Sequence, residues 1–353
     1  MGDITAVVLT LGEDTTARAL DSVRRQSYPA RETVVVSDTT PFHAALNLGA
    51  SRVRTKFFVQ VDADMILDPG CFEALRDCAG DHVGIVAGHL RDPLSGRVSS
   101  VKLFRTECFG RSRFGDSISP DTDFAAAIMK DGWSLIYALK FEGTSPVLWH
   151  TFGEHRPDYT PQYTFSKYLL EGRRYRYRKD PGGLLWHLGR LGKSKHPAAG
   201  VAQVALAQGI FIEEESDLLS RPSGHPDFSL LERYMSSRKR RRLSPLAASL
   251  MGMCSPLKAF EKSYRLGIRL RRADAYPDFR RCLEGLTARG LRLFWPAFIG
   301  LCRGSFVEEF SARKFENDCR KFRDLMAGQP RPALFREALR SWPGKILRRR
   351  ISR

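Results

Sequence analysis

The first third of the chain alternates short apolar runs with amphipathic stretches. Residues 4–9 (ITAVVL) form a β-branched run without polar alternation, which is typical of a strand buried on both faces of a parallel sheet. Thr15 or Thr16 can cap the helix that follows, and Pro29 ends it. The pattern predicts, in order, strands at 4–9, 33–38 and 57–61, each buried, with helices at 17–26 and 43–50 between them. This order indicates an α/β fold with a doubly wound sheet.

The pattern changes at about residue 185. Long amphipathic stretches, prolines at intervals and few β-branched runs predict short helices there. The chain has 57 Lys and Arg against 39 Asp and Glu, a formal net charge of +18. Because residues 1–184 contain as many acidic as basic side chains, the whole excess lies in 185–353. We therefore predict two domains, 1–184 and a basic, mainly helical 185–353.

Cysteine use and hydropathy indicate the compartment. The 7 cysteines are odd in number, scattered and without a C-x-x-C pair, which favours a reducing environment over a disulfide framework or zinc ribbon. The N-terminus has no basic segment before its first apolar run and meets an acid at Asp3, unlike a signal peptide. Since each long uncharged window is broken by Gly, Pro, Ser or Gln, we expect a cytoplasmic protein that is soluble or peripheral at the inner membrane face.

Polar clusters follow each of the three predicted strands: residues 10–14, Asp38, and Asp62 with Asp64. Sheets of this kind bind ligands beyond the carboxyl ends of their strands. Two carboxylates at a strand end can hold Mg²⁺ or Mn²⁺ together with substrate phosphates. An isolated D-x-D is often only a solvated turn, but its place after a buried strand favours the metal interpretation.

At this point the chain resembles glycosyltransferase family 2, the nucleotide-sugar transferases with the GT-A fold. The similarity runs through VVLTLGED, ALDSVRRQSYPARETVVVSD, LNLG and FFVQVDADMILDPGCFEAL. The positions that match the family pattern are Ser22, Gln26, Pro29, Asp38, Asn47, Gly49, Asp62 and Asp64. The resemblance implies that Thr10, Glu13 and Asp38 contact the nucleotide. It also implies that Asp62 faces the ribose or the metal, and that Asp64 ligates the metal on the diphosphate.

The family has a further acidic site ahead of a helix, usually Glu-Asp-x-Asp, which supplies the catalytic base. SISPDTDFAAAIMKDGW resembles it, with Pro120 in place of the Glu, Asp121 in the base position and Asp123 beyond it. The resemblance implies that Asp121 deprotonates the acceptor hydroxyl opposite the leaving group, so that the sugar is transferred with inversion. The alternative is that Asp121 only caps a helix that begins at Phe124.

A metal-ligating histidine often follows in the family, and two candidates are present. His150 lies in VLWHTF and His155 in GEHRPDYTP, and the strand-like run before His150 favours it. Each could instead be a histidine satisfied by backbone hydrogen bonds. The chain also departs from the family pattern at Leu46, where an Arg is usual, and at Ser37, where a first Asp is usual.

The basic half allows several interpretations. Residues 175–180, 238–242 and 348–353 could rest on an anionic membrane surface, and the apolar stretch at 243–253 could lie in its interface. They could also bind a polyanionic acceptor, and binding to nucleic acid is a further alternative that we do not expect. The remaining interpretation is that they are the solvated faces of helices.

Together these observations predict an inverting, metal-dependent glycosyltransferase of the hexosyltransferase type. It would use Mn²⁺ or Mg²⁺, a donor such as a UDP- or GDP-sugar, and a glycan or lipid-linked acceptor of the envelope or polysaccharide type. The alternative is a GT-A scaffold that transfers nucleotides or is not catalytic, and whose basic half binds a membrane, a polyanion or nucleic acid.

Overall fold

The computed structural model describes residues 2–138, 140–142, 145–147, 150–211, 256–272, 299–300, 303 and 311–327. Within them the chain forms two compact units. The sheet unit holds the described residues up to Tyr163 together with Lys193–Gly200, and the helical unit holds Thr164–Gly192 and those from Val201 on. These are units of packing, and the domain boundary predicted after residue 184 stays a prediction.

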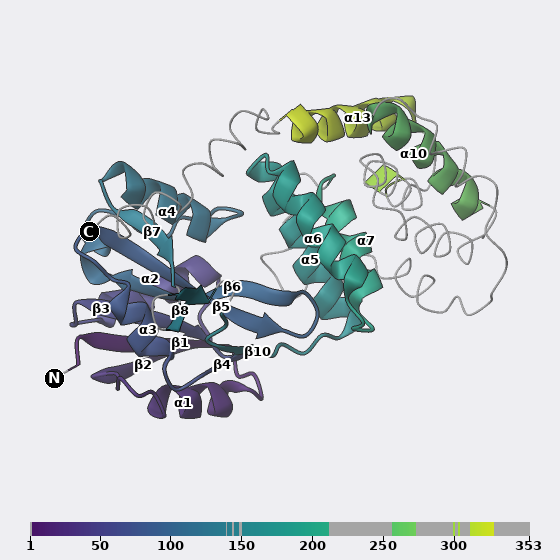
Figure 1. The fold of residues 1–353 in the computed structure, drawn as a ribbon. Coiled ribbons are helices and arrows are strands. Elements are labelled where there is room, and N and C mark those ends of the chain that lie inside the picture. The colour runs from purple at the N-terminus through teal and green to yellow at the C-terminus, as the bar shows by residue number, and fades with distance from the viewer. Residues whose placement is uncertain are drawn as a thin grey trace. The chain divides into compact units, whose positions relative to one another are not determined.

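The elements follow the predicted alternation (Figure 1). In chain order they are β1 (Ile4–Thr10), α1 (Thr16–Arg24), β2 (Glu32–Ser37), α2 (Phe42–Arg52), β3 (Phe57–Asp62), β4 (Met65–Leu67), α3 (Cys71–Asp77), β5 (Val83–Asp92), β6 (Gly96–Arg105), the 3-10 helix η1 (Thr106–Gly110), α4 (Pro120–Lys130), β7 (Ser134–Tyr137), β8 (Lys140–Glu142), β9 (Ser145–Val147), β10 (Gly153–His155), α5 (Pro161–Tyr177), α6 (Pro181–Lys193), α7 (Ala199–Gly209), α10 (Pro256–Arg272) and α13 (Ala312–Ala327).

The main sheet is mixed and has the strand order β2-β1-β3-β6-β5-β10-β4, with β7 paired to β5. Strands β2, β1 and β3 are parallel, whereas β6 runs antiparallel to both β3 and β5. The predicted α/β fold with a doubly wound mixed sheet is confirmed. One detail is wrong: among the described residues β2 is an edge strand that pairs with β1 alone, and Val35 is 39% exposed.

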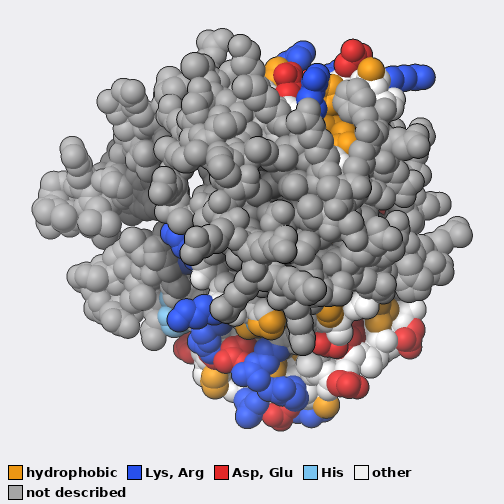
Figure 2. Space-filling model, turned by 90° about the vertical axis from the view of Figure 1, so that its right-hand side faces the viewer, with side chains coloured by type: hydrophobic (Ala, Val, Ile, Leu, Met, Phe, Trp, Pro, Cys, Tyr) orange, Lys and Arg blue, Asp and Glu red, His pale blue; other side chains and the backbone are white. Residues whose placement is uncertain are grey.

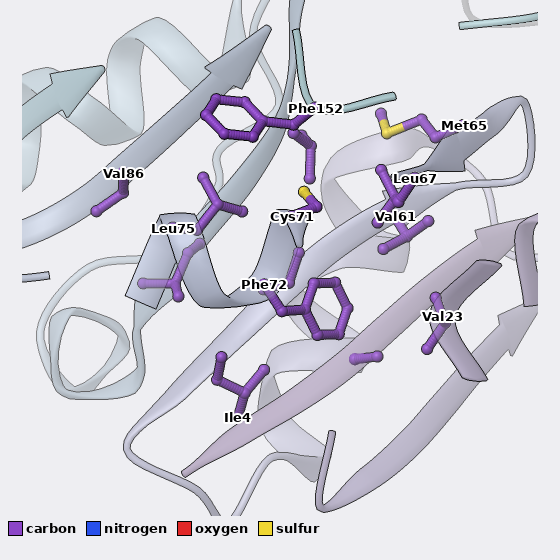
Figure 3. Packing of buried hydrophobic residues seen from close by; sticks show 14 of the residues in the cluster. Ile4, Val23, Val61, Met65, Leu67, Cys71, Phe72, Leu75, Val86 and Phe152 are labelled. Carbon is purple, nitrogen blue, oxygen red and sulfur yellow. The ribbon is translucent and has the colours of Figure 1, made fainter. Parts of the chain in front are cut away.

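Helices cover both faces of this sheet. On one face Val23 of α1 and Phe72 and Leu75 of α3 pack over the strands (Figure 3). On the other, Leu46 of α2 and Phe124 of α4 complete a second apolar cluster. Because both faces of the sheet are buried, polar side chains can gather at the carboxyl ends of its parallel strands.

The helical unit is built from α5, α6, α7, α10 and α13. Of these, α7, α10 and α13 lie in the half predicted to be helical, whereas α5 and the start of α6 precede residue 185. Helices α5 and α7 approach closely at two glycines. A Cβ on Gly172 would lie 2.2 Å from the Leu206 carbonyl oxygen, and one on Gly209 would lie 2.0 Å from that of Leu169. Between α10 and α13, Phe260 stacks on Phe322 with 4.5 Å between ring centroids.

The membrane prediction is tested only in part. No helix among the described residues is long and apolar enough to cross a bilayer. Residues 238–242, 243–253 and 348–353 lie outside the described residues. Within 175–180, Tyr177, Arg178 and Lys179 are exposed, while Tyr175 contacts His187 (Oη to Nδ1, 3.1 Å). On the face drawn in Figure 2, the described basic side chains are interspersed with acidic ones.

Candidate active site

The site lies at the carboxyl end of β1, where Thr10 anchors the following loop. Thr10 Oγ1 donates to Glu13 Oε2 (2.9 Å) and accepts from the Gly12 amide (3.0 Å). The Leu11 amide also donates to Glu13 Oε2 (2.7 Å). Glu13 therefore shapes the β1–α1 loop in addition to any contact with a ligand. Asp38, at the end of the neighbouring β2, donates its amide to the Thr10 carbonyl (3.0 Å) and has a φ of 51°.

Asp62 is the last residue of β3, and Asp64 lies in the turn that leads to β4. Asp62 Oδ1 accepts a hydrogen bond from Gln60 Nε2 (2.8 Å). Burial, and then the negative charge of Asp64, raise the pKa of Asp62 to about 6, against the opposing effects of Gln60 and of the Lys102 ammonium. A cation at this turn would relieve the repulsion between the two carboxylates.

His155 lies between two carboxylates. Its Nε2 is 3.2 Å from Asp64 Oδ2, and its Nδ1 is 2.7 Å from Asp92 Oδ2. The register of β10 against β4, which pairs His155 with Met65, brings this residue beside Asp64. His155 is thus the candidate histidine that lies at the acidic turn, whereas His150 packs edge-on against Phe152.

Asp92, at the end of β5, is fully buried and surrounded by donors. Its Oδ1 accepts from the Leu94 and Ser95 amides and the Ser95 hydroxyl, and its Oδ2 from Tyr159 Oη and His155 Nδ1. Burial acts to raise the pKa of Asp92, but the hydrogen bonds from His155, Tyr159 and Ser95 outweigh it and hold the pKa well below its usual range. Because an ionised carboxylate only accepts, His155 Nδ1 must be the donor. In the neutral ring the lone pair is then on Nε2, on the side of Asp64.

This donor set fits a divalent cation. Two neighbouring ligands of an octahedral ion with bonds of about 2.1 Å lie about 3 Å apart, close to the 3.2 Å between His155 Nε2 and Asp64 Oδ2. A carboxylate that accepts from the other ring nitrogen of a metal-ligating histidine is the usual supporting arrangement. No group of three or more His, Cys, Asp or Glu side chains suited to a metal exists among the described residues.

An aromatic group borders the acidic turn. Tyr159 lies edge-on to Tyr163 at the start of α5 and to His196, with centroid distances of 6.2 and 5.3 Å. Burial, and then the charges of Asp64 and Asp62, raise the pKa of the Tyr163 hydroxyl well above its ordinary value. The effect of both charges places Tyr163 beside these carboxylates.

Asp121 is held by a lysine. Its Oδ2 is 2.7 Å from Lys102 Nζ, and Lys102 lies on β6. Helix α4 begins at Pro120 rather than at Phe124, so Asp121 lies in the first turn and not at the cap position that the alternative assumed. Asp123 Oδ2 accepts from the Ser117 hydroxyl and thereby holds the loop before α4.

Several residues of the sequence motif maintain the site's backbone rather than line it. Gln26 accepts from the Phe72 amide (2.9 Å) and donates to the Asp68 carbonyl (2.9 Å), which joins α1 to the loop after β4. The Asn47 side chain donates a hydrogen bond to the Phe114 carbonyl and accepts one from the Phe114 amide. At Gly49, a Cβ would lie 2.4 Å from Val7 Cγ1, so only glycine lets α2 pack this close to β1.

Sequence reasoning missed Asp92, Lys102 and Tyr159. Asp92 ends an apolar strand, as Asp62 does, and that shared position was a usable signal. Lys102 is a single charge within the otherwise apolar run VKLF, which is also visible in the sequence. Nothing local distinguishes Tyr159, whose role depends on the fold.

Comparison with known proteins gives structural similarity at low identity. No protein-family model and no curated protein matches the chain. Among solved structures, the mannosyltransferase PcManGT from Pyrobaculum calidifontis in complex with GDP-Man and Mn²⁺ is similar over 87% of this chain and 88% of its own, with 15% identity and a TM-score of 0.41. S. aureus TarS 1-349 in complex with UDP is similar over 87% of this chain and 91% of its own, with 12% identity and a TM-score of 0.33.

Proposed function

We propose that the protein transfers a hexosyl group from a nucleoside-diphosphate sugar to an acceptor hydroxyl, with a divalent cation and with inversion at the anomeric carbon. The observation that carries the proposal is a pair of contacts, in which His155 lies between Asp64, which comes just after β3, and Asp92 at the end of β5. It presents a carboxylate oxygen and an imidazole nitrogen at the spacing of two metal ligands. Asp121, whose charge contributes to raising the pKa of Asp62, supplies a carboxylate at the same edge of the sheet.

Asp64 and His155 would hold Mn²⁺ or Mg²⁺, which when bound neutralises the charge that develops on a leaving nucleoside diphosphate. Thr10, Glu13 and Asp38 lie on the loops after β1 and β2, where they can contact the nucleotide. Asp121 accepts the proton of the acceptor hydroxyl as its oxygen bonds to the anomeric carbon. The bond from that carbon to the diphosphate breaks, and its electron pair leaves with the diphosphate.

A glycan or lipid-linked acceptor and a peripheral site at the inner membrane face belong to the proposal. The net charge of +18, which lies in the second half of the chain, supports attraction to an anionic acceptor or surface. Nucleotidyl transfer, or binding without transfer, is distinguished from sugar transfer by the products of the experiments below.

The first experiment is calorimetric titration of UDP and then GDP, with and without Mn²⁺. We expect Mn²⁺-dependent binding to the wild type and its loss in Asp64→Ala, because that variant lacks one ligand. Asp68→Ala is the matched control, since its side chain faces Arg91 (Oδ1 to Nη2, 3.7 Å) and should leave binding unchanged. A folded wild type that binds no nucleoside diphosphate, with UDP and GDP tried first, would refute the proposal.

A second experiment tests the stereochemistry. The preferred nucleotide is offered as its sugar conjugate, with water as a slow acceptor, and the released sugar is followed by NMR before it mutarotates. Inversion predicts that the first anomer has the configuration opposite to that of the donor. Release of the same anomer, or of a nucleoside monophosphate, would contradict the mechanism.

A further inference from the structure

Lys102 lies on the sheet face that leads into the site. Across the antiparallel pair β3 and β6, Phe58 is opposite Phe104 and Gln60 is opposite Lys102. Because residues two apart on a strand share a face, Phe58, Gln60 and Asp62 form one row. Along this face the side chains of β3 change from aromatic to polar to acidic toward the carboxyl end of the strand. Lys102 lies beside the polar residue, Gln60.

The lysine side chain is largely buried and is turned toward a carboxylate. It is 14% exposed, against 42% for Asp121, and the two charged atoms are 2.7 Å apart. Gln60 beside it is 2% exposed. An apolar side chain would serve such a position at least as well for stability, since burying an ammonium costs free energy that the ion pair only partly returns. The pair is therefore better explained by what it does to Asp121.

We propose that Lys102 is a positioning residue of the transfer reaction, which holds the Asp121 carboxylate ionised and in place at the acceptor side of the site. The inference rests on the proposed function, because it assigns a partner to the base of that reaction. The salt bridge engages Oδ2 of Asp121. The first turn of α4 acts in the same direction, since helix N-termini favour negative charge.

The consequence of removing Lys102 follows from the charges around Asp121. Among the described residues these charges include Lys102 on β6, Asp62 on β3 and Asp123 in the same helical turn. Removing Lys102 takes away a positive charge 2.7 Å from Asp121 Oδ2, so protonation of Asp121 becomes easier. An enzyme is inactive while its general base is protonated. If Asp121 is protonated up to a higher pH, the enzyme therefore loses activity at acidic pH and regains it as the pH rises.

The test is the pH profile of kcat/KM for sugar release from the preferred donor, measured on the full chain. In Lys102→Met we expect the acidic limb to move to higher pH by about one unit or more. Activity should fall about tenfold or more at the acidic end and recover toward alkaline pH. Lys102→Arg keeps the charge and should retain the wild-type profile. Lys56→Met is the control, because Lys56 lies over the Phe57 ring at the amino end of β3.

Nucleotide binding separates this role from its alternatives. Because Lys102 also lowers the pKa of Asp62, the Kd is measured at alkaline pH, where Asp62 is ionised with or without the lysine. There the Kd of UDP or GDP with Mn²⁺ should be similar in Lys102→Met and wild type. Lost nucleotide binding would assign Lys102 to the donor instead, and an unchanged pH profile would show that the salt bridge is only structural; either result overturns the inference. If Lys102→Met does not fold, Lys102→Gln gives the same readout. A wild type without binding or turnover would refute the proposed function itself, and that failure is visible before any variant is made.

Discussion

Replacement of Asp92 by Asn tests how His155 is prepared for a cation. The two side chains have the same shape, but the amide has one acceptor and one donor end. Three donors, from Leu94 and Ser95, converge on Oδ1 and will keep the amide oxygen there. The NH₂ group must then face His155 Nδ1 and Tyr159 Oη. To accept from it, His155 has to carry its proton on Nε2, the atom that faces Asp64.

The magnitudes separate folding from binding. The Asn NH₂ can donate to both His155 and Tyr159, so the number of hydrogen bonds is preserved, and we expect a loss of about 1 kcal/mol in unfolding free energy from weaker, uncharged bonds. Metal affinity should fall about 10- to 100-fold, or about 1.4–2.8 kcal/mol, as is usual when the group behind a metal-ligating histidine is changed.

The assay is titration of Mn²⁺ in saturating nucleoside diphosphate, with free Mn²⁺ followed by electron paramagnetic resonance. Tyr159→Phe is the matched control, because it removes the other donor to the same oxygen and leaves His155 Nδ1–H bonded to Asp92. The Mn²⁺ affinity of Tyr159→Phe should change little. The affinity of His155→Ala shows how much is lost when the histidine ligand is removed altogether. The tautomer argument is refuted if folded Asp92→Asn binds Mn²⁺ as tightly as the wild type while His155→Ala does not.

Two further predictions concern stability. Gly49→Ala should lower the unfolding free energy by about 1–2 kcal/mol despite the better helix propensity of alanine, because the new Cβ would lie 2.4 Å from Val7 Cγ1. Denaturant unfolding measures this loss, and adding Val7→Ala should recover part of it. Absence of the loss or of the recovery would contradict a clash with Val7. At the other end of the sheet, burial acts to raise the pKa of Asp3, but hydrogen bonds from Tyr28 and Arg76 outweigh it and lower the pKa. The stability that Asp3 contributes is therefore present above the ordinary carboxyl pKa of about 4 and is lost as the pH falls through the lower, folded-state value. Asp3→Asn should be less stable than wild type at pH 7, and thermal unfolding should show the gap closing at acidic pH; a gap independent of pH would refute this role.

Much of the sheet could be predicted from the sequence because burial leaves a local pattern. β1 and β3 are runs of apolar residues without polar alternation, and both are central strands buried on both faces. Asp62 ends β3 and Asp64 follows two residues later, so their place at its carboxyl end is fixed by chain order. β2 shows the limit: its valines resemble those of β1, but only strand order decides that it lies at the edge.

The partners of the site residues were decided by the tertiary structure. His150 has the more strand-like context, yet pairing of β10 with β4 brings His155 to Asp64. Asp92 reaches His155 across 63 positions of sequence, and Lys102 reaches Asp121 from another strand. Such contacts depend on strand register, and a shift of one residue would turn each side chain to the opposite face of the sheet. The sequence by itself thus determined which chemical groups end the strands, and the register of the folded sheet determined which of them meet.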